Sequence, residues 1–597
     1  MENQRNIILA VVLTALVLFG WDAGVRYFYP HAEKPAEAAS APQLDAAGAQ
    51  DSVPAKHTRE GGLTSPADVA LEKQDLKQAL SAGGRLPVEA PGLSGSVNLT
   101  GAIIDDLVIN RHRQNVEKGS GPERIFSPAG TPAQHFAQFG WTGRDGFDHP
   151  TPATVWSAPQ GAKLTPDSPV ELSWSNQTGQ TFKIRLAIDE DYMITARQTV
   201  ENAGDGAVVV RPFALINRTD RTASVDSFNV HAGPIGVFGD TLEYGPDYDD
   251  VRDAGTISNE GRTGWVGFTD VYWLSALIPG ELRADSDFRA LAGSNYRADL
   301  LYDPVTVSNG KKVSVETRLF AGAKESEILD RYEETGIPKF SRAIDWGWFE
   351  IIEKPILWLL KSLFSLVGNF GVAIILLTVI VRGIMFPVAQ RQFASMAAMR
   401  AVQPKMKAIQ ERYKDDKQKQ QQEVMALYKR EGVNPLAGCL PIFLQIPIFF
   451  ALYKVLILSI EMRHQPFVLW IRDLSAPDPL HVLNLFGLLP FTPPSFLGIG
   501  VLALLLGLTM YFQFKMNPAP VDPVQEQMFK VMPWVMMFIM APFAAGLLLY
   551  WTTSNLLTIA QQKYLYSRHP QLRAQNEKDA EDKKRAAERD NSAKAGK

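Results

Sequence analysis

The sequence predicts a polytopic α-helical membrane protein that carries a large all-β domain outside the membrane. Residues 369–566 contain several apolar runs near the ~20 residues that cross a ~30 Å hydrocarbon core. Residues 94–322 instead hold short alternating runs separated by Gly, Pro, Asn and Asp, which is typical of strands. Pro30–Phe349 has 30 basic and 44 acidic residues (30 − 44 = −14), whereas Val388–Asn434 has 10 and 5 (10 − 5 = +5). The positive-inside rule therefore puts the basic segment in the cytoplasm and the β-domain outside.

The N-terminal apolar run Ile7–Phe19 has the length of a secretory signal. The nearest A-x-A triplet, Ala39-Ser40-Ala41, lies too far beyond it for normal cleavage. We therefore expect residues 1–29 to form an uncleaved signal anchor with the N-terminus inside. Residues 30–93 are rich in Ala, Pro, Gly and charge, which predicts a flexible linker outside the membrane with a short helix around Ala67–Leu80.

Period-2 alternation within residues 94–322 predicts an antiparallel sandwich. In the clearest strand, Val313, Val315, Thr317 and Leu319 alternate with polar residues. Further strand candidates are Phe182–Ile188, Tyr192–Val200 and Val208–Ile216. The chain has a single cysteine, Cys439, so no intramolecular disulfide is possible and the domain must be stabilised by its core.

Residue patterns typical of metal, cofactor or catalytic sites are missing from the sequence. A group of aspartates lacks the spacing of an EF-hand and indicates a solvated loop. The histidines of the β-domain form no HExxH pair and are expected to be structural or surface residues. No GxxxxGK[ST] occurs, so we expect a non-enzymatic protein without a nucleotide or cofactor. The aspartates are Asp247, Asp249, Asp250 and Asp253, and the histidines are His112, His135, His149 and His231.

Residues 323–368 are predicted to connect the β-domain to the membrane through interfacial amphipathic helices. Four apolar side chains are predicted to lie in one stripe on a helix face, and three tryptophans are predicted to anchor the helices at the membrane–water interface. The stripe is Ile344, Trp348, Ile351 and Ile352, and the anchors are Trp346, Trp348 and Trp358.

The span predicted at residues 369–387 contains Arg382. A charge within the membrane costs about 2.5–3.5 kcal/mol on insertion scales. The apolar part, about sixteen residues at ~1.5 Å each, reaches only ~24 Å. Arg382 either faces a wet, protein-lined interior or lies near the helix end and extends to the headgroups.

The basic segment 388–434 is predicted to form a cytoplasmic helical hairpin. Its helices, Gln390–Tyr413 and Lys417–Glu431, end before Gly432. Their apolar stripes either pack on each other or present an adaptable methionine-rich surface, with the basic face toward ribosomal RNA or anionic lipid. The methionines concerned are Met396, Met399, Met406 and Met425.

The remaining chain predicts four further spans. These are residues 435–458, 496–514, 531–541 and 544–566, the last two joined around Ala541-Pro542-Phe543. An outer loop (459–495), a cytoplasmic loop (515–530) and a charged cytoplasmic tail (567–597) complete the chain.

Polar residues recur within these apolar spans. Trp551, Asn555, Thr558 and Gln562 follow one another at i, i+4, i+7 and i+11, which is one helix face. Such residues can simply hold helices together. However, Gln445, Gln513 and the Thr378/Arg382 pair also need a polar interior, so we favour one shared cavity.

Several long motifs in order carry a resemblance to a known family. These are GSVNLTGAIIDDLVINRHR, VGNFGVAIILLTVIVRGIMFP, FVLWIRDLSAPDP and FAAGLLLYWTTSNLLTIAQQ. Together they resemble the YidC family of membrane-protein insertases in its long Gram-negative form. The resemblance implies six transmembrane helices, five of them around a hydrophilic groove open to cytoplasm and lipid, and a periplasmic β-super-sandwich. It also implies that Arg382, Thr378 and Trp551 contact the client in the groove, and that the hairpin takes part in early client capture.

The function implied by this resemblance is insertion and folding of inner-membrane proteins, alone or with the Sec translocon. The implied partners are nascent clients, the Sec translocon, the ribosome and membrane lipids. The implied location is the bacterial inner membrane, with both termini in the cytoplasm. Two alternatives are a secondary transporter, although the spans show no repeat, and a membrane-tethered periplasmic sugar-binding or sugar-modifying protein, although no catalytic cluster occurs.

Overall fold

The computed structural model describes residues 57–568 except residues 83, 118, 145, 227–229, 415, 433–439, 487, 490–497 and 517–522. The predicted signal anchor, the linker up to residue 56, Cys439 and the tail from residue 569 lie outside the described residues. The side chains of Trp348 and Met396 are also outside them.

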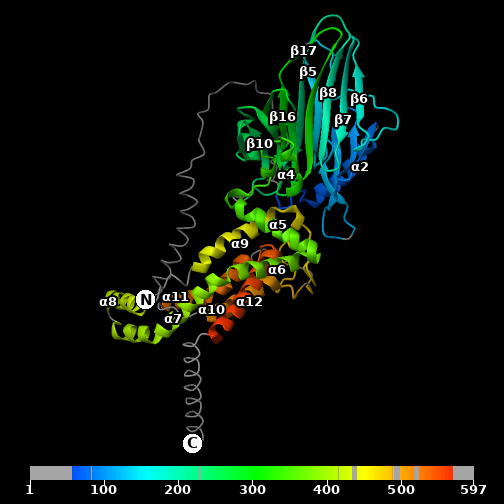
Figure 1. Ribbon diagram of the computed structural model, residues 1–597. Coiled ribbons are helices and arrows are strands. Elements are labelled where there is room, and N and C mark those ends of the chain that lie inside the picture. The colour runs from blue at the N-terminus through cyan, green and yellow to red at the C-terminus, as the bar shows by residue number, and fades with distance from the viewer. Residues whose placement is uncertain are drawn as a thin grey trace, which may run out of the picture. The chain divides into compact units, whose positions relative to one another are not determined.

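The β-domain consists of two large antiparallel sheets (Figure 1). The ten-stranded sheet has the order β1-β2-β3-β5-β9-β16-β15-β12, with β4 paired to β3 and β17 paired to β9. Its strands are β1 Arg85–Glu89, β2 Leu93–Asn98, β3 Ile103–Arg113, β4 Pro122–Phe126, β5 His135–Gly143, β9 Val208–Thr219, β12 Thr256–Ser258, β15 Ala284–Leu291, β16 Asn295–Tyr302 and β17 Val305–Val307.

The eight-stranded sheet has the order β11-β10-β13-β14-β18-β8-β7-β6. Its strands are β6 Val170–Ser175, β7 Gln180–Ile188, β8 Met193–Asn202, β10 Gly233–Phe238, β11 Thr241–Glu243, β13 Thr263–Thr269, β14 Trp273–Pro279 and β18 Lys311–Ala323. The predicted sandwich and all four predicted strands are confirmed, because alternate residues of these strands are buried and large aromatic side chains fill the core. The first strand begins at Arg85, before the predicted start of the domain.

Two short helices accompany the strands. Helix α2 (Pro66–Ser81) starts at the Ser65 cap, in agreement with the predicted helix in the linker. Helix α3 (Tyr248–Ala254) corrects the predicted aspartate loop. Asp247 and Asp250 form a reciprocal capping box at the N-terminus of α3. Their carboxylates therefore cap a helix instead of lining an irregular loop.

The connection to the helical region contains α4 (Ser326–Glu334), two short 3-10 turns, η2 (Phe340–Ala343) and η3 (Gly347–Phe349), and α5 (Glu350–Val367). The single apolar stripe predicted here is wrong. Ile344 and Trp346 are 1% and 2% exposed and belong to the packed core, whereas Ile351 and Trp358 on α5 are 86% and 70% exposed. The positive φ of Gly347 interrupts the helical period between the two groups.

The helical region contains α6 (Phe370–Ile384), α7 (Phe386–Arg412), α8 (Lys417–Glu431), α9 (Leu440–Leu458), α10 (Val501–Met516), α11 (Pro523–Met540) and α12 (Ala545–Arg568) (Figure 1). Among the described residues, no helix alone has both the length and the apolar composition to cross a membrane. One bent pair does by those two criteria, α6 together with the first part of α7, at an angle of 58°. Pro387 therefore begins α7, where its missing N–H is harmless, and does not end α6.

The hairpin formed by α7 and α8 is confirmed, including the left-handed Gly432 that ends α8. Val402 and Met406 of α7 pack on Leu427 and Tyr428 of α8, and the Tyr428 hydroxyl donates to Met406 Sδ at 3.0 Å. Met399 is partly buried against this cluster, whereas Met425 is 52% exposed. The contact between the two helices thus buries Met406 and partly buries Met399, whereas Met425 faces outward.

Candidate functional site

A cavity of about 430 Å³ lies within the helical region. Its walls come from six helices, α6, α7, α9, α10, α11 and α12. Five of the six residues predicted for a polar interior line it: Arg382, Gln445, Gln513, Trp551 and Asn555. Residues up to 173 positions apart thus meet around one space, and they come from four separate apolar runs.

Among the described residues that line this cavity, Arg382 is the only lysine or arginine. Asn369 caps α6 by accepting from the Val372 N–H at 3.1 Å, and Arg382 follows in the last turn, where the helix dipole favours a cation. Its Nε donates to Ser554 Oγ of α12 at 3.0 Å, and Nη2 donates to the same oxygen. Within the part of the chain that the structure describes, no carboxylate forms an ion pair with Arg382. A neutral hydroxyl therefore orients the guanidinium but leaves its charge uncompensated.

Helix α12 supplies the polar wall of the cavity. The predicted stripe of Trp551, Asn555, Thr558 and Gln562 lines it along its whole length. Asn555 Nδ2 donates to Thr509 Oγ1 of α10 at 3.2 Å, and Thr558 Oγ1 donates to the Ser554 carbonyl at 2.7 Å. These bonds satisfy part of the polar stripe within the protein, as buried polar groups require.

Helix α9 forms a further wall of the cavity and contacts α12 there. Gln445 Nε2 donates to the Tyr550 hydroxyl of α12. Trp551 meets Phe449 of α9 edge to face, with ring centroids 5.0 Å apart and an interplanar angle of 64°. The pair of contacts fixes α9 against α12 at the level of the cavity.

Much of the remaining lining is apolar and adaptable. Methionines from α10 and α11 face the space together with aromatic and aliphatic side chains of α9 and α10. Unbranched methionine side chains fit partners of different shape. These residues are Met510, Met532, Met536, Ile446, Phe450 and Phe514.

Thr378, the sixth predicted residue, is not among the lining residues of this cavity. It lies one turn before Arg382, is 1% exposed, and donates from Oγ1 to the Ile374 carbonyl at 2.6 Å. In this structure its hydroxyl is satisfied inside α6.

Sequence reasoning missed Ser554 and Tyr550, the partners of Arg382 and Gln445. Tyr550, Ser554 and Gln561 follow at i, i+4 and i+11, a second polar row beside the predicted one. This second row could have been recognised from the sequence. The residues that it contacts on α6 and α9, however, are more than a hundred residues away in the sequence.

In the described residues of the β-domain, the histidines singled out in the sequence make structural contacts. Within the described residues, no three His, Cys, Asp or Glu side chains are grouped to hold a metal ion. His135 bonds Ser275 Oγ at 2.9 Å, and its complete burial, together with the nearby Arg218 charge, lowers its pKa well below the ordinary value. His112 meets Glu325 at 3.0 Å, and His149 and His231 bond backbone carbonyls.

Two family models match the chain. Residues 85–359 match the model of the YidC periplasmic domain, and residues 362–573 match the model of the 60Kd inner membrane protein. Together they cover most of the chain.

Full-length relatives match as well. The membrane protein insertase YidC of Zymomonas mobilis is 44% identical over 579 residues, covering 95% of this chain and 96% of the relative. Those of Rhizobium johnstonii and Beijerinckia indica are 41% and 42% identical over 577 and 589 residues, with the same coverage. Among solved structures, the active YidC insertase with its first transmembrane domain resolved covers 83% of this chain and 97% of its own, at 18% identity and a TM-score of 0.35.

Proposed function

The chain belongs to the YidC family of membrane protein insertases, and from this premise we propose how its cavity receives a client. It is a non-enzymatic inner-membrane protein with a periplasmic domain, and its function is the insertion of inner-membrane proteins. This assignment replaces the transporter and sugar-binding alternatives.

The proposed entry step is attraction of a polar or acidic client segment by Arg382. The observation that carries this proposal is a charge oriented by a serine hydroxyl and unpaired with any carboxylate of the described residues. Two charges 4 Å apart attract by about 4 kcal/mol at an effective dielectric constant of 20. A client carboxylate that approaches Arg382 therefore gains more than it would in water, and cavity side chains offer hydrogen bonds to its backbone.

The proposed exit step is lateral movement of the apolar client segment into lipid. Burial of apolar surface supplies roughly 25 cal/mol per Å², so a hydrophobic helix gains free energy as it leaves the polar cavity. Gln445, Gln513, Trp551 and Asn555 would contact the client during passage. Thr378, which is buried one turn from Arg382, would reach a client only when α6 separates from its neighbours.

The proposed topology has six spans, with a groove open to cytoplasm and lipid and both termini in the cytoplasm. The helical hairpin would meet the client first, because Met425 is exposed beside a basic surface. Its basic residues would also suit the ribosome and anionic lipid. The protein would also cooperate with the Sec translocon.

The test of the charge step pairs variants of Arg382 with matched clients in proteoliposomes. One single-span client carries an acidic outer tail, and the other has its tail carboxylates changed to amides. We expect Arg382→Ala to lower insertion of the acidic client about tenfold and that of the neutral client much less. Arg382→Lys should retain much of the activity, because it keeps the charge.

Two further variants separate charge from polarity and from general basicity. Arg382→Gln keeps hydrogen-bond donors without charge, and Arg391→Gln removes an exposed charge from α7. Equal insertion of both clients by Arg382→Ala, or full activity of Arg382→Gln with the acidic client, would contradict the charge step. Arg391→Gln should insert both clients normally.

A further inference from the structure

The loop that follows α9 carries a buried arginine. After the 3-10 turn η5 (Ile460–Met462), the Arg463 side chain is only 5% exposed. Its Nε donates to Glu60 Oε2 at 2.5 Å and its Nη2 donates to Glu123 Oε2 at 3.2 Å. Nη1 donates to the Arg113 carbonyl at 2.8 Å and Nη2 to the Gln114 carbonyl at 3.3 Å.

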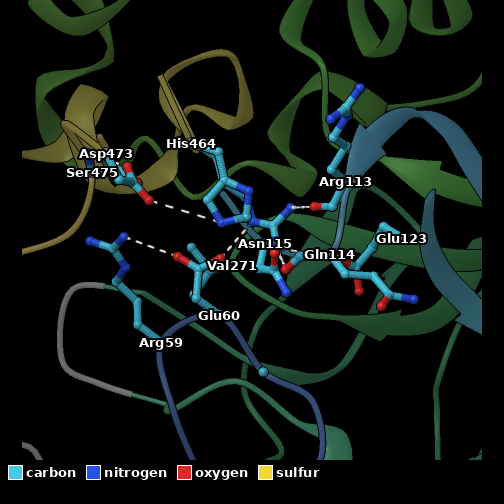
Figure 2. Close-up of polar contacts among 12 residues, drawn as sticks. Arg59, Glu60, Arg113, Gln114, Asn115, Glu123, Val271, His464, Asp473 and Ser475 are labelled. Atoms are coloured by element: carbon cyan, nitrogen blue, oxygen red, sulfur yellow. Dashed lines mark hydrogen bonds and ion pairs between the residues drawn. The ribbon is translucent and has the colours of Figure 1, made fainter. Parts of the chain in front are cut away.

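All four of these acceptors belong to the β-domain or to the segment before α2. Figure 2 shows Glu60, Arg113, Gln114 and Glu123 gathered beside His464, the residue next to Arg463. The guanidinium also lies over two aromatic rings of the β-domain, 5.7 Å from the Tyr272 centroid and 5.1 Å from that of Trp273. One side chain of the helical region is thus enclosed by the β-domain.

The charges of this cluster depend on Arg463. Burial opposes ionisation of Glu60, but the charge and hydrogen bond of Arg463, together with the charges of Arg59 and His464, lower the Glu60 pKa. Burial raises the pKa of Glu123 to about 7, although Arg463 acts in the opposite direction. Without the arginine, two neighbouring, partly buried carboxylates would lose their main counter-charge, an arrangement that is unfavourable.

Further polar contacts hold the same end of α9. Glu461 of η5 accepts from Lys361 Nζ of α5 at 3.4 Å and from Ser326 Oγ of α4 at 3.1 Å. Lys454 Nζ of α9 donates to the Asp345 carbonyl at 2.7 Å. The outer end of α9 is therefore attached to the β-domain and to the connection that leaves it.

The other half of α9 contributes Gln445 and Phe449 to the wall of the client cavity. A helix transmits displacement along its axis because its backbone bonds keep it stiff over a few turns. We propose that Arg463 is a positioning residue that docks the β-domain on the outer end of α9 and thereby holds α9 in place as a cavity wall. The docking does not depend on the proposed function, whereas its effect on insertion rests on it.

The test measures docking and insertion separately in the full-length protein in lipid nanodiscs and proteoliposomes. Spin labels at Val155 of the β-domain and Leu469 of the loop, both exposed, report their separation after Cys439 is changed to serine. We expect one narrow distance distribution for the parent and a broad one for Arg463→Gln. Loss of a buried charge partner should shift the docking equilibrium on the order of 100-fold. Insertion should fall at least about fivefold, within the usual range of coupling between sites.

Arg59→Gln is the matched control. Arg59 also lies over Tyr272, at 5.9 Å, and meets Glu60 at 3.2 Å, but it belongs to the same side of the contact as the β-domain. We expect Arg59→Gln to leave the distance distribution narrow and insertion near the parent level. A broad distribution for this variant would contradict the specific role of Arg463.

Rescue distinguishes docking from a general loss of folding. Arg463→Lys should restore part of both readouts, and the exchange Arg463→Glu with Glu123→Arg keeps the same charges in the cluster and should restore more than either single change. If Arg463→Gln does not fold, the double exchange variant alone provides the test. Its failure to recover the narrow distance distribution overturns the proposal. An unchanged distribution or unchanged insertion in folded Arg463→Gln also overturns it.

The proposed client mechanism can fail independently. Arg382→Ala should leave the distance between Val155 and Leu469 unchanged, because Arg382 has no part in docking. If Arg382→Ala inserts all clients normally while Arg463→Gln still broadens the distribution and lowers insertion, the charge step is wrong and the docking role stands.

Discussion

The β-domain and the helical region differ in the side chains that they expose. In the β-domain, large aromatic residues such as Trp141 and Phe182 are buried where the two sheets meet. In the helical region, the most exposed side chains include Ile351, Trp358 and Ile384, whereas Asn555 is buried. Each part is therefore arranged for its own solvent: water surrounds the first, and lipid suits the second.

This difference gives a physical reason for the proposed client site to lie among the helices. A water-exposed domain stabilises itself with an apolar core and leaves little room for polar groups inside. A lipid-exposed bundle can turn apolar side chains outward and keep a polar interior, provided that its polar groups find partners. The Arg382–Ser554 and Asn555–Thr509 contacts are such partners.

The largest expected effect comes from Trp141→Ala. Trp141 is 2% exposed and contacts Trp156 and Phe182, with ring centroids 6.1 and 5.2 Å apart. Its removal should lower the free energy of unfolding of the β-domain by about 3–5 kcal/mol, measured by denaturant titration in detergent. Trp358→Ala is the control, because this indole is exposed and the stability of the β-domain should not change. Similar losses in both variants would break the comparison.

A smaller effect is expected from the buried cation Lys324 of the β-domain. Its Nζ donates to Thr269 Oγ1 and to the Ala343 carbonyl, and burial lowers its pKa from 10.5 to about 8. Between these values the unfolded chain binds the extra proton, so stability rises with pH. From about pH 8 to pH 9.5 the free energy of unfolding should rise by about 2 kcal/mol more in the parent than in Lys324→Met. Parallel pH profiles of the two proteins would show that Lys324 is not the cause.

A change of about 1 kcal/mol is expected when a polar group inside the helical region is removed. Asn555→Leu abolishes the bond to Thr509, and membrane hydrogen bonds of this kind contribute about 0.6–1.7 kcal/mol. The measurement is unfolding of the helical region in mixed micelles. Thr509→Val should cost a similar amount, and the double variant should cost clearly less than the sum of the two. Additive losses would mean that the two side chains do not interact.

The smallest effect is expected at the surface of the hairpin. Lys405 Nζ lies 2.8 Å from Glu431 Oε1, with the lysine side chain 57% exposed. Solvent screens such pairs, so Lys405→Gln should change hairpin stability less than any of the variants above. Tyr428→Phe is the comparison within the buried contact, since it removes the hydroxyl that donates to Met406 Sδ. Thermal unfolding followed by helix content would rank the two, and a larger loss for Lys405→Gln would contradict the ranking.

Sequence periodicity determined much of this protein. The alternation of Val313, Val315, Thr317 and Leu319 predicted β18, and the break after Tyr413 predicted the hairpin, because each pattern shows which face of one element is buried. The same reasoning grouped Asn555 with Gln445 around a polar interior. It failed at Ile344, where a glycine interrupts the helix, and at Asp247, where a carboxylate caps a helix.

Only the tertiary structure decided which residues meet. Arg382 and Ser554 are 172 residues apart, and Arg463 and Glu60 are 403 apart. The pattern of one segment shows that a side chain needs a partner, since a buried charge or amide without one is costly, but it does not contain the identity of that partner. That identity depends on how the helices and the β-domain pack, which sets the Ser554 contact of Arg382, the satisfied hydroxyl of Thr378 and the enclosed guanidinium of Arg463.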